Sequence, residues 1–174
     1  VDVHPQVESV SAPGIDGQLL ARARLERRAA EPIGSEQLET SADPAFRRVQ
    51  IHGQFDAAHS LLLDNRQRDG KVGVELLQPF QDQATGLWLL VNRGWLPWPD
   101  RRVPPQFTTP ADALSLDAWV YVSPGATFQL HADPSSSTWP KLLPAIDPNA
   151  LWAALGREGF AYELRAETGP ATYQ

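Results

Sequence analysis

The segment Asn92-Arg93-Gly94-Trp95 holds the residue types best suited to recognition chemistry in this chain. It directly follows the apolar run Leu87–Val91, so a strand should hold its side chains in fixed directions. Arginine and tryptophan are frequent energetic anchors of protein interfaces, which predicts Asn92, Arg93 and Trp95 as docking residues. The alternative is a structural role. Asn92 and Arg93 would then bond loop carbonyls and Gly94 would permit a tight backbone, while Trp95 would cap the core.

The remaining reactive residue types show no spacing that defines a catalytic or metal site. The sequence has no phosphate-binding glycine loop, dinucleotide fingerprint, zinc-protease motif or serine-hydrolase motif. The serine run 135–137 has no base placed beside it. No specific pair stands out among the acids Asp56, Asp64, Asp69 and Asp82. We therefore predict no catalytic residue and no metal ligand.

Histidine is the remaining candidate ligand for a haem or a metal ion. The four histidines, His4, His52, His59 and His131, share no metal-ligand spacing. A ligand would normally need a second histidine or a strong acceptor that orients it. Each histidine is therefore predicted to be a solvated side chain, and the residues that would bind a cofactor stay unknown.

Composition excludes several classes of function. The 174 residues predict one domain, and the net charge of −6 argues against nucleic acid as a partner. The absence of cysteine removes disulfides, thiol nucleophiles and thiolate zinc sites. No apolar stretch approaches 18 residues, so this sequence contains no predicted membrane span. The absence of methionine, even at position 1, predicts a processed or excised segment of a longer protein.

Alternating or continuous apolar runs predict the strands that would position the recognition segment. These runs cover residues 47–55, 61–63, 74–80, 87–95, 118–122, 127–130 and 160–164. The run 87–95 is apolar on both faces, which predicts a central strand. Gly53 falls on the apolar side of its strand and predicts a bulge or a close neighbour there. Five prolines between residues 97 and 110 predict a long, extended surface connection.

Capping signals predict one helix near each end of the chain. Asp16 can cap a helix over residues 18–30, and Asp147-Pro148 opens a second helix that Gly156 ends. The sum is an α+β fold in a single domain: a mostly antiparallel sheet or partly closed barrel of six to seven strands with two helices. The first helix is basic through Arg22, Arg24, Arg27 and Arg28. It predicts a solvated face or, alternatively, a segment near anionic lipid head groups.

Residues Leu89–Pro97 read LLVNRGWLP, which resembles the signature of the Surfeit locus protein 1 family of cytochrome c oxidase assembly factors. Upstream, the block 46–49 followed by Gly53-Gln54-Phe55 is similar to a strand of that family. Further similar blocks, in the family's order, are Leu61–Leu63 with Asn65-Arg66, then Gly70, Gly73 and Pro79, and later Trp139-Pro140, Ile146-Asp147 and Leu151. The resemblance covers residues 17–165. The sequence departs from the family pattern at Val74 and over 75–78, and is only loosely similar after Trp119.

The resemblance implies an assembly factor of the bacterial inner membrane, with residues 1–174 forming its domain on the periplasmic side. Two flanking membrane helices, absent from this chain, would anchor it. The domain would be a non-catalytic scaffold that docks to the catalytic subunit of a haem–copper oxidase and to other assembly factors. It would assist the insertion or stabilisation of haem a, which would bind through the missing helices and not through this domain. Both ends, Val1 and Gln174, would then lie on the same side of the domain.

Two alternatives remain open at this stage. A periplasmic haem- or small-ligand-binding module would have a concave aromatic pocket with a histidine turned inward. A small hydrolase would bring a nucleophile, a base and an orienting group within hydrogen-bond reach.

Overall fold

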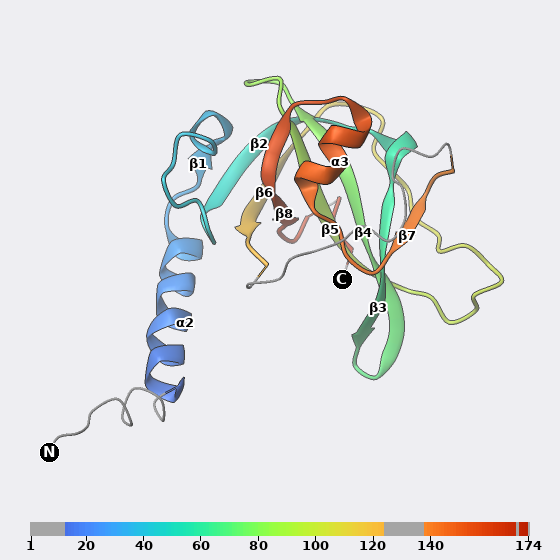
Figure 1. Cartoon of the computed structure of the whole chain (residues 1–174), viewed down its shortest axis with the longest axis horizontal. Coiled ribbons are helices and arrows are strands. Elements are labelled where there is room, and N and C mark those ends of the chain that lie inside the picture. The colour runs from blue at the N-terminus through green and yellow to red at the C-terminus, as the bar shows by residue number, and fades with distance from the viewer. Residues whose placement is uncertain (1–12, 124–137, 170, 174) are drawn as a thin grey trace, which may run out of the picture.

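The computed structural model describes residues 13–123, 138–169 and 171–173 (Figure 1). Its helices and strands are α2 (Pro13–Ala29), β1 (Ile33–Gly34), β2 (Arg48–Phe55), β3 (Leu61–Arg68), β4 (Lys71–Asp82), β5 (Trp88–Pro97), β6 (Leu114–Tyr121), β7 (Lys141–Leu143), α3 (Pro148–Leu155) and β8 (Gly159–Ala166). These eight strands belong to one sheet, in the order β1-β2-β6-β8-β5-β4-β3-β7. None of the helices in the described ranges is both long and apolar enough to cross a bilayer.

Strand β4 closes the sheet into a five-stranded barrel. It pairs with β5 along most of its length, and its last residues, Phe80–Asp82, pair with Gly53–Phe55 of β2. The circuit β2-β6-β8-β5-β4 is thereby complete. Gly53 lies at the closure, where a Cβ atom would collide with the backbone of Gln81. The close neighbour predicted for Gly53 is confirmed, and the reason is that two strands meet there.

Apolar residues at alternating positions fill the barrel and cover its outside. On β2, Val49 and Ile51 are buried while Gln50 and His52 are exposed, as the alternation predicts. On β5, Leu89 and Val91 belong to the cluster inside the barrel. Leu90 points the other way, into a second cluster that includes apolar residues of α3. The prediction that β5 is apolar on both faces and lies inside the sheet is confirmed.

The second helix follows its predicted capping signals. The side chain of Asp147 accepts a hydrogen bond from the Asn149 backbone N–H, and Pro148 opens the helix. Gly156 ends it with a left-handed backbone at φ 68°. Helix α3 lies between β7 and β8 in the chain, and it packs against β8 and the outer face of the sheet.

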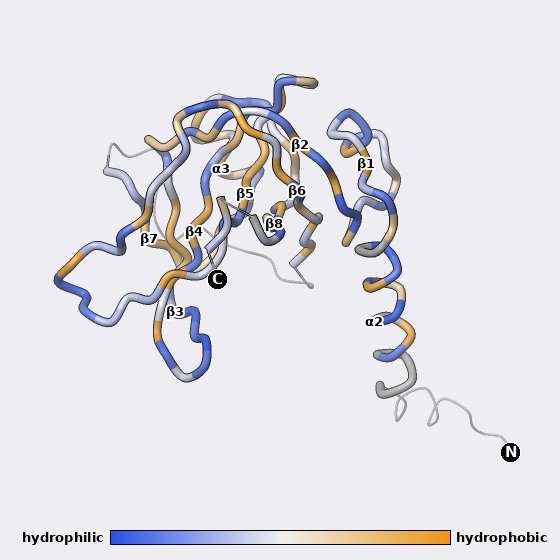
Figure 2. Tube along the Cα trace, turned by 180° about the vertical axis from the view of Figure 1, so that it is seen from behind, coloured by the Kyte–Doolittle hydropathy of each residue, from blue (hydrophilic) through white to orange (hydrophobic). Residues whose placement is uncertain are grey.

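The first helix stands away from the barrel, as Figures 1 and 2 show. It begins at Pro13, before the predicted cap, and two of its arginines hold its C-terminal half to the segment that precedes β2. Arg24 lies over the ring of Phe46, and Arg27 donates to the carbonyl oxygen of Asp43 at 2.9 Å. Arg22 is exposed as predicted. The side chain of Arg28 lies outside the described part of the chain.

The strand count and the strand limits differ from the prediction. Strands β1 and β7 are two and three residues long, too short for any periodicity to reveal. Strands β3 and β4 extend into a polar hairpin around the turn Asp69-Gly70, where both residues have positive φ. The sheet is mostly antiparallel, although β1–β2, β3–β7 and β5–β8 pair in parallel. The strand predicted over 127–130 and the two chain ends lie outside the described residues.

Candidate functional site

A β-bulge in β5 sets the directions of the side chains in the recognition segment. Leu77 of β4 faces Asn92, but Leu76 faces Gly94, so Arg93 is the extra residue of the pair. The side-chain oxygen of Asn92 accepts the Gly94 backbone N–H at 2.9 Å, which holds the bulge in shape. Gly94 has φ 115°, a value that favours glycine. As a result Asn92 and Trp95 face one pocket, while Arg93 turns to the other side.

Arg93 is buried, with 2% of its surface exposed. Its Nε donates to the carbonyl oxygen of Ala171 at 2.8 Å, and one Nη donates to that of Thr108 at 2.8 Å. The other Nη donates to the side-chain oxygen of Gln78 at 2.9 Å. Burial lowers the pKa of the guanidinium, which Tyr173 partly offsets. Arg93 therefore bonds loop carbonyls, as predicted for a structural role. Its docking role stays a prediction, and the side chain is not exposed for it.

The segment after β8 returns to β5 through Gly94. The backbone N–H of Tyr173 donates to the carbonyl oxygen of Arg93 at 2.6 Å, and Gly94 forms a parallel bridge with Tyr173. A Cβ atom on Gly94 would collide with the Tyr173 carbonyl group. The phenol oxygen of Tyr173 also accepts the Thr108 backbone N–H at 2.8 Å. The segment 171–173 is thus fixed to the barrel at the recognition segment.

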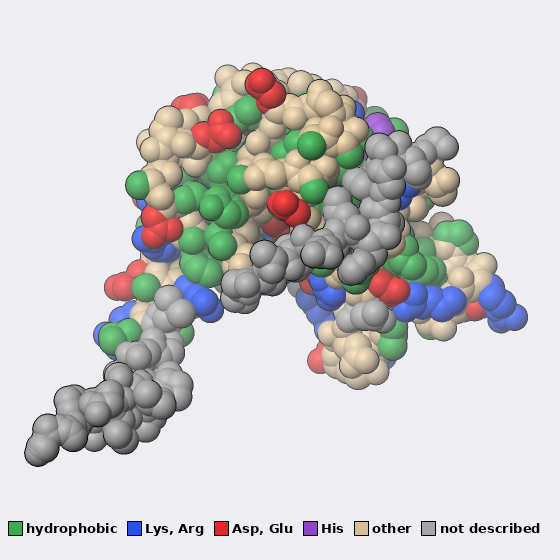
Figure 3. Space-filling view, viewed as in Figure 1, with side chains coloured by type: hydrophobic (Ala, Val, Ile, Leu, Met, Phe, Trp, Pro, Cys, Tyr) green, Lys and Arg blue, Asp and Glu red, His purple; other side chains and the backbone are tan. Residues whose placement is uncertain are grey.

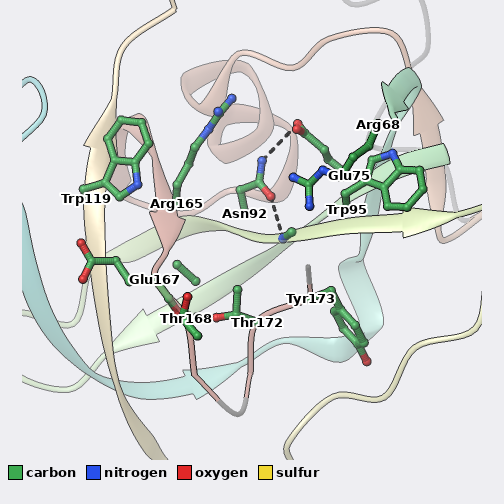
Figure 4. A pocket seen from close by; sticks show the side chains of 12 residues that line it. Arg68, Glu75, Asn92, Trp95, Trp119, Arg165, Glu167, Thr168, Thr172 and Tyr173 are labelled. Atoms are coloured by element: carbon green, nitrogen blue, oxygen red, sulfur yellow. Dashed lines mark hydrogen bonds between the residues drawn. The ribbon is translucent and has the colours of Figure 1, made fainter. Parts of the chain in front are cut away.

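Between β5 and the segment after β8 lies a pocket with a volume of about 490 Å³. In Figure 4, Arg68 and Trp95 lie on one side of Asn92. Arg165 and Trp119 lie on its other side. These side chains come from β3, β5, β6 and β8, so the closed barrel brings together residues far apart in sequence.

Asn92 forms the floor of this pocket and links two carboxylates. Its Nδ2 donates to Glu75 at 3.2 Å and to Glu163 at 2.9 Å. Arg165 also donates to Glu163, from Nε at 3.0 Å. Burial raises the pKa of the Glu163 carboxyl, and the bonds from Arg165 and Asn92 only partly oppose this effect. Asn92 bonds carboxylates, and the prediction that it bonds loop carbonyls is wrong.

Trp95 is 8% exposed and packs against a glycine on the neighbouring strand. A Cβ atom on Gly73 would collide with its indole ring. Its Nε1 donates to the carbonyl oxygen of Arg66 at 3.0 Å, and the Arg68 guanidinium lies 5.7 Å from the ring centroid. Trp95 is therefore buried at the base of the β3–β4 hairpin and also lines the pocket. Its docking role stays a prediction.

The described histidines lie outside this pocket. His52 is exposed, with Nδ1 2.8 Å from the Ser115 hydroxyl, which confirms a solvated side chain. The same prediction is wrong for His59, which is half-buried between Asp56, 2.7 Å from Nδ1, and the ring of Trp139. His4, His131 and the serine run 135–137 lie outside the described residues. Among the residues that are described, no three histidine, cysteine or acidic side chains converge to hold a metal ion.

The comparison with family models covers almost the whole chain. The model of the SURF1 family matches residues 16–173. The chain belongs to the SURF1 family. The resemblance carried by LLVNRGWLP is therefore confirmed. No curated protein matches the chain.

Membership connects this geometry to a biological process. The SURF1 family is a family of assembly factors linked to cytochrome oxidase assembly. Three glycines in the segments that resemble this family have a structural role in the chain. Gly53 permits the β2–β4 closure, Gly73 makes room for Trp95, and Gly94 accepts the returning C-terminal segment.

Sequence reasoning missed half of the pocket. Arg68, Trp119, Arg165 and the residues after β8 carried no motif that marked them as partners of Asn92. One signal was available for Arg93, because alternation from Leu89 and Val91 directs its side chain into the barrel. A weaker signal was available in the sequence for Arg165. This residue directly follows the alternating strand 160–164, just as Asn92 follows Leu87–Val91.

Proposed function

We propose that this chain is the extramembrane domain of a bacterial cytochrome c oxidase assembly factor that acts as a scaffold. It would be anchored in the inner membrane by segments outside this sequence, with the domain on the periplasmic side. There it would dock to the catalytic subunit of a haem–copper oxidase, together with other assembly factors, and assist the insertion or stabilisation of haem a. Membership of the SURF1 family supports the link to oxidase assembly.

The observation that carries the scaffold role is how the recognition segment uses its polar groups. Asn92 and Arg93 make their hydrogen bonds to the protein's own carboxylates, carbonyls and side chains. Trp95 is held on three sides, by Gly73, Arg66 and Arg68. These contacts hold a surface pocket in a fixed shape, which favours recognition of a partner over a reaction that needs mobile donors.

The described pocket does not fit a haem. Its lining contains two tryptophans and a tyrosine, but the remainder is largely charged or polar, and no histidine is among the lining residues. The sequence has no methionine or cysteine that could replace a histidine as axial ligand. His52 and His59 are bonded elsewhere, to Ser115 and Asp56. We therefore assign haem a to the parts of the full-length protein outside this chain and derive no step through it.

Absorbance titration with haem tests this assignment. The purified chain is titrated beside the longer protein that carries its flanking segments. We expect a defined Soret shift with one haem per molecule only for the longer protein. Stoichiometric binding by the isolated chain would contradict the scaffold role and favour the alternative, a haem- or small-ligand-binding module. Alanine variants of the four histidines, His52→Ala and His131→Ala first and then His4→Ala and His59→Ala, would identify the ligand.

A further inference from the structure

The pocket beside Asn92 is surrounded by more positive than negative groups. Four guanidinium groups and three carboxyl groups lie in or directly behind its walls: Arg48, Arg66, Arg68 and Arg165, with Glu75, Glu163 and Glu167. One positive charge is therefore left over in a chain whose net charge is −6. In Figure 3, Lys and Arg side chains are visible in the lower half of the molecule, around α2, the β3–β4 hairpin and the connection after β5, with Asp and Glu side chains among them.

The three carboxyl groups already have cationic partners. Glu167 accepts hydrogen bonds from Nε and from Nη2 of Arg48, each at 3.1 Å. Glu75 lies 3.6 Å from Nε of Arg66. Glu163 receives the bond from Arg165, and burial raises the pKa of its carboxyl. The carboxyl groups around the pocket are thus neutralised by the arginines behind them.

Arg68 is the cation that remains. Its side chain is exposed, and it makes no ion pair or hydrogen bond with any residue in the described ranges. Its guanidinium lies 5.7 Å from the centroid of the Trp95 ring. Figure 4 shows the guanidinium of Arg68 directed toward the pocket from the end of β3. A guanidinium on an aromatic wall, with its donors free, is suited to bind a carboxylate in a bidentate manner.

The opposite wall is aromatic. Arg165 lies 3.6 Å from the centroid of the Tyr121 ring, and Trp119 stands edge-on to Tyr121 with centroids 5.9 Å apart. Trp119 lines the pocket across from Trp95. An apolar side chain next to a bound carboxylate would therefore meet an aromatic surface. Arginine and tryptophan around a pocket are the composition of an interface anchor site.

We propose that this pocket binds an acidic segment of a partner protein, with a carboxylate of that segment on Arg68 and an adjacent apolar side chain between Trp95 and Trp119. The proposal rests on the proposed scaffold function and names the chemistry of the docking partner. It moves the docking role from Arg93, which is buried, to Arg68, which is exposed. Nucleic acid is disfavoured because the chain as a whole repels a polyanionic backbone.

Binding of a defined peptide tests the proposal. The probe is an acetylated, amidated pentapeptide of alternating glutamate and leucine, titrated into the 174-residue chain and followed by the indole N–H signals in NMR spectra. We expect saturable binding that shifts the signals of Trp95 and Trp119 and weakens as salt is added. The same pentapeptide with glutamine in place of glutamate should not bind.

Two matched variants test whether a carboxylate of the peptide binds Arg68. Arg68→Gln should weaken peptide binding about tenfold, because it removes a charge-assisted hydrogen bond from an exposed side chain. Arg102→Gln is the control, since the side chain of Arg102 is 90% exposed and, within the described ranges, pairs only with Asp100. It should bind as the unchanged chain does.

Each remaining outcome overturns the proposal. No binding, equal binding of the glutamine peptide, or equal weakening by both variants would show that Arg68 does not read a carboxylate. Equal binding of glutarate would show a site for small anions instead of a protein segment. Failure of the peptide to bind leaves the proposed function intact, because that function is tested separately by haem titration and by oxidase assembly in cells.

Discussion

The Nε–H of Arg93 donates to the carbonyl oxygen of Ala171 at 2.8 Å, across 78 residues of chain. This bond joins the bulge in β5 to the segment that follows β8. Because the same bulge directs Asn92 and Trp95 into the pocket, the shape of the pocket and the position of the C-terminal segment depend on one buried guanidinium. A change at Arg93 should therefore disturb both.

Arg93→Lys should destabilise the chain although it keeps the charge. A lysine cannot reproduce the planar fork that bonds Ala171, Thr108 and Gln78 at once, so buried acceptors lose their donors. We expect a loss of about 2–4 kcal/mol in the free energy of unfolding, measured with urea. The exposed control Arg102→Lys should change it by less than about 0.5 kcal/mol. Equal stability of the two variants would show that the bonds of Arg93 do not hold the fold.

Gly94→Ala should release the C-terminal segment. A Cβ atom at Gly94 collides with the Tyr173 carbonyl group, and the φ of 115° adds backbone strain. We expect a loss of about 2–4 kcal/mol and faster amide exchange at Tyr173. Gly70→Ala separates strain from collision, because Gly70 also has positive φ but has no atom within 4 Å of the added Cβ. That control should lose only about 1 kcal/mol, and a similar loss for both would contradict the close approach.

Glu163→Gln should alter how stability depends on pH. Burial raises the pKa of Glu163 above its usual 4.5, so the folded state binds more protons than the unfolded state in that window. The stability contribution is therefore fully present below pH 4.5 and is lost as pH rises through the raised pKa. We expect the stability of Glu163→Gln relative to the unchanged chain to increase from acid to neutral pH in urea unfolding. A constant difference would show that Glu163 is not perturbed in the folded state.

Asp56→Asn should show the opposite pH dependence. Burial acts to raise the pKa of Asp56, but hydrogen bonds from His59 and Arg157 outweigh it and lower the pKa below its usual 3.8. This stabilisation is present above pH 3.8 and is lost as pH falls through the lowered pKa. The variant should be less stable by about 1–3 kcal/mol near neutral pH, with the difference shrinking below pH 3.8. A difference that persists in acid would point to a packing effect.

Local patterns were sufficient for much of the fold. The alternation of β2 and the caps of α3 lie within a few neighbouring residues, so the sequence displays them directly. The strand residues that flank the turn Asp69-Gly70, at 64–68 and 71–73, were missed because this largely polar stretch carries no apolar alternation. Strand β7 was missed because three residues define no period.

The candidate site was only half predictable. The residues of the recognition segment stand together in the chain, and the sequence identified all of them. Their hydrogen-bond partners are distant in the chain: Glu163 lies 71 residues from Asn92, and Ala171 lies 78 residues from Arg93. The bulge also reverses the alternation after Asn92, which brings Trp95 to the pocket and leaves Arg93 inside. Only the closed barrel determines these contacts.

Oxidase assembly in cells tests the scaffold role most directly. In a bacterial strain that lacks the full-length gene, oxidase-bound haem a is measured in membranes after the intact protein is supplied. In parallel, a version is supplied that keeps its flanking segments but has a flexible linker in place of residues 48–173. At equal membrane levels, we predict that the intact protein restores haem a in the oxidase and that the version without the barrel does not. Full restoration without the barrel would contradict the scaffold role.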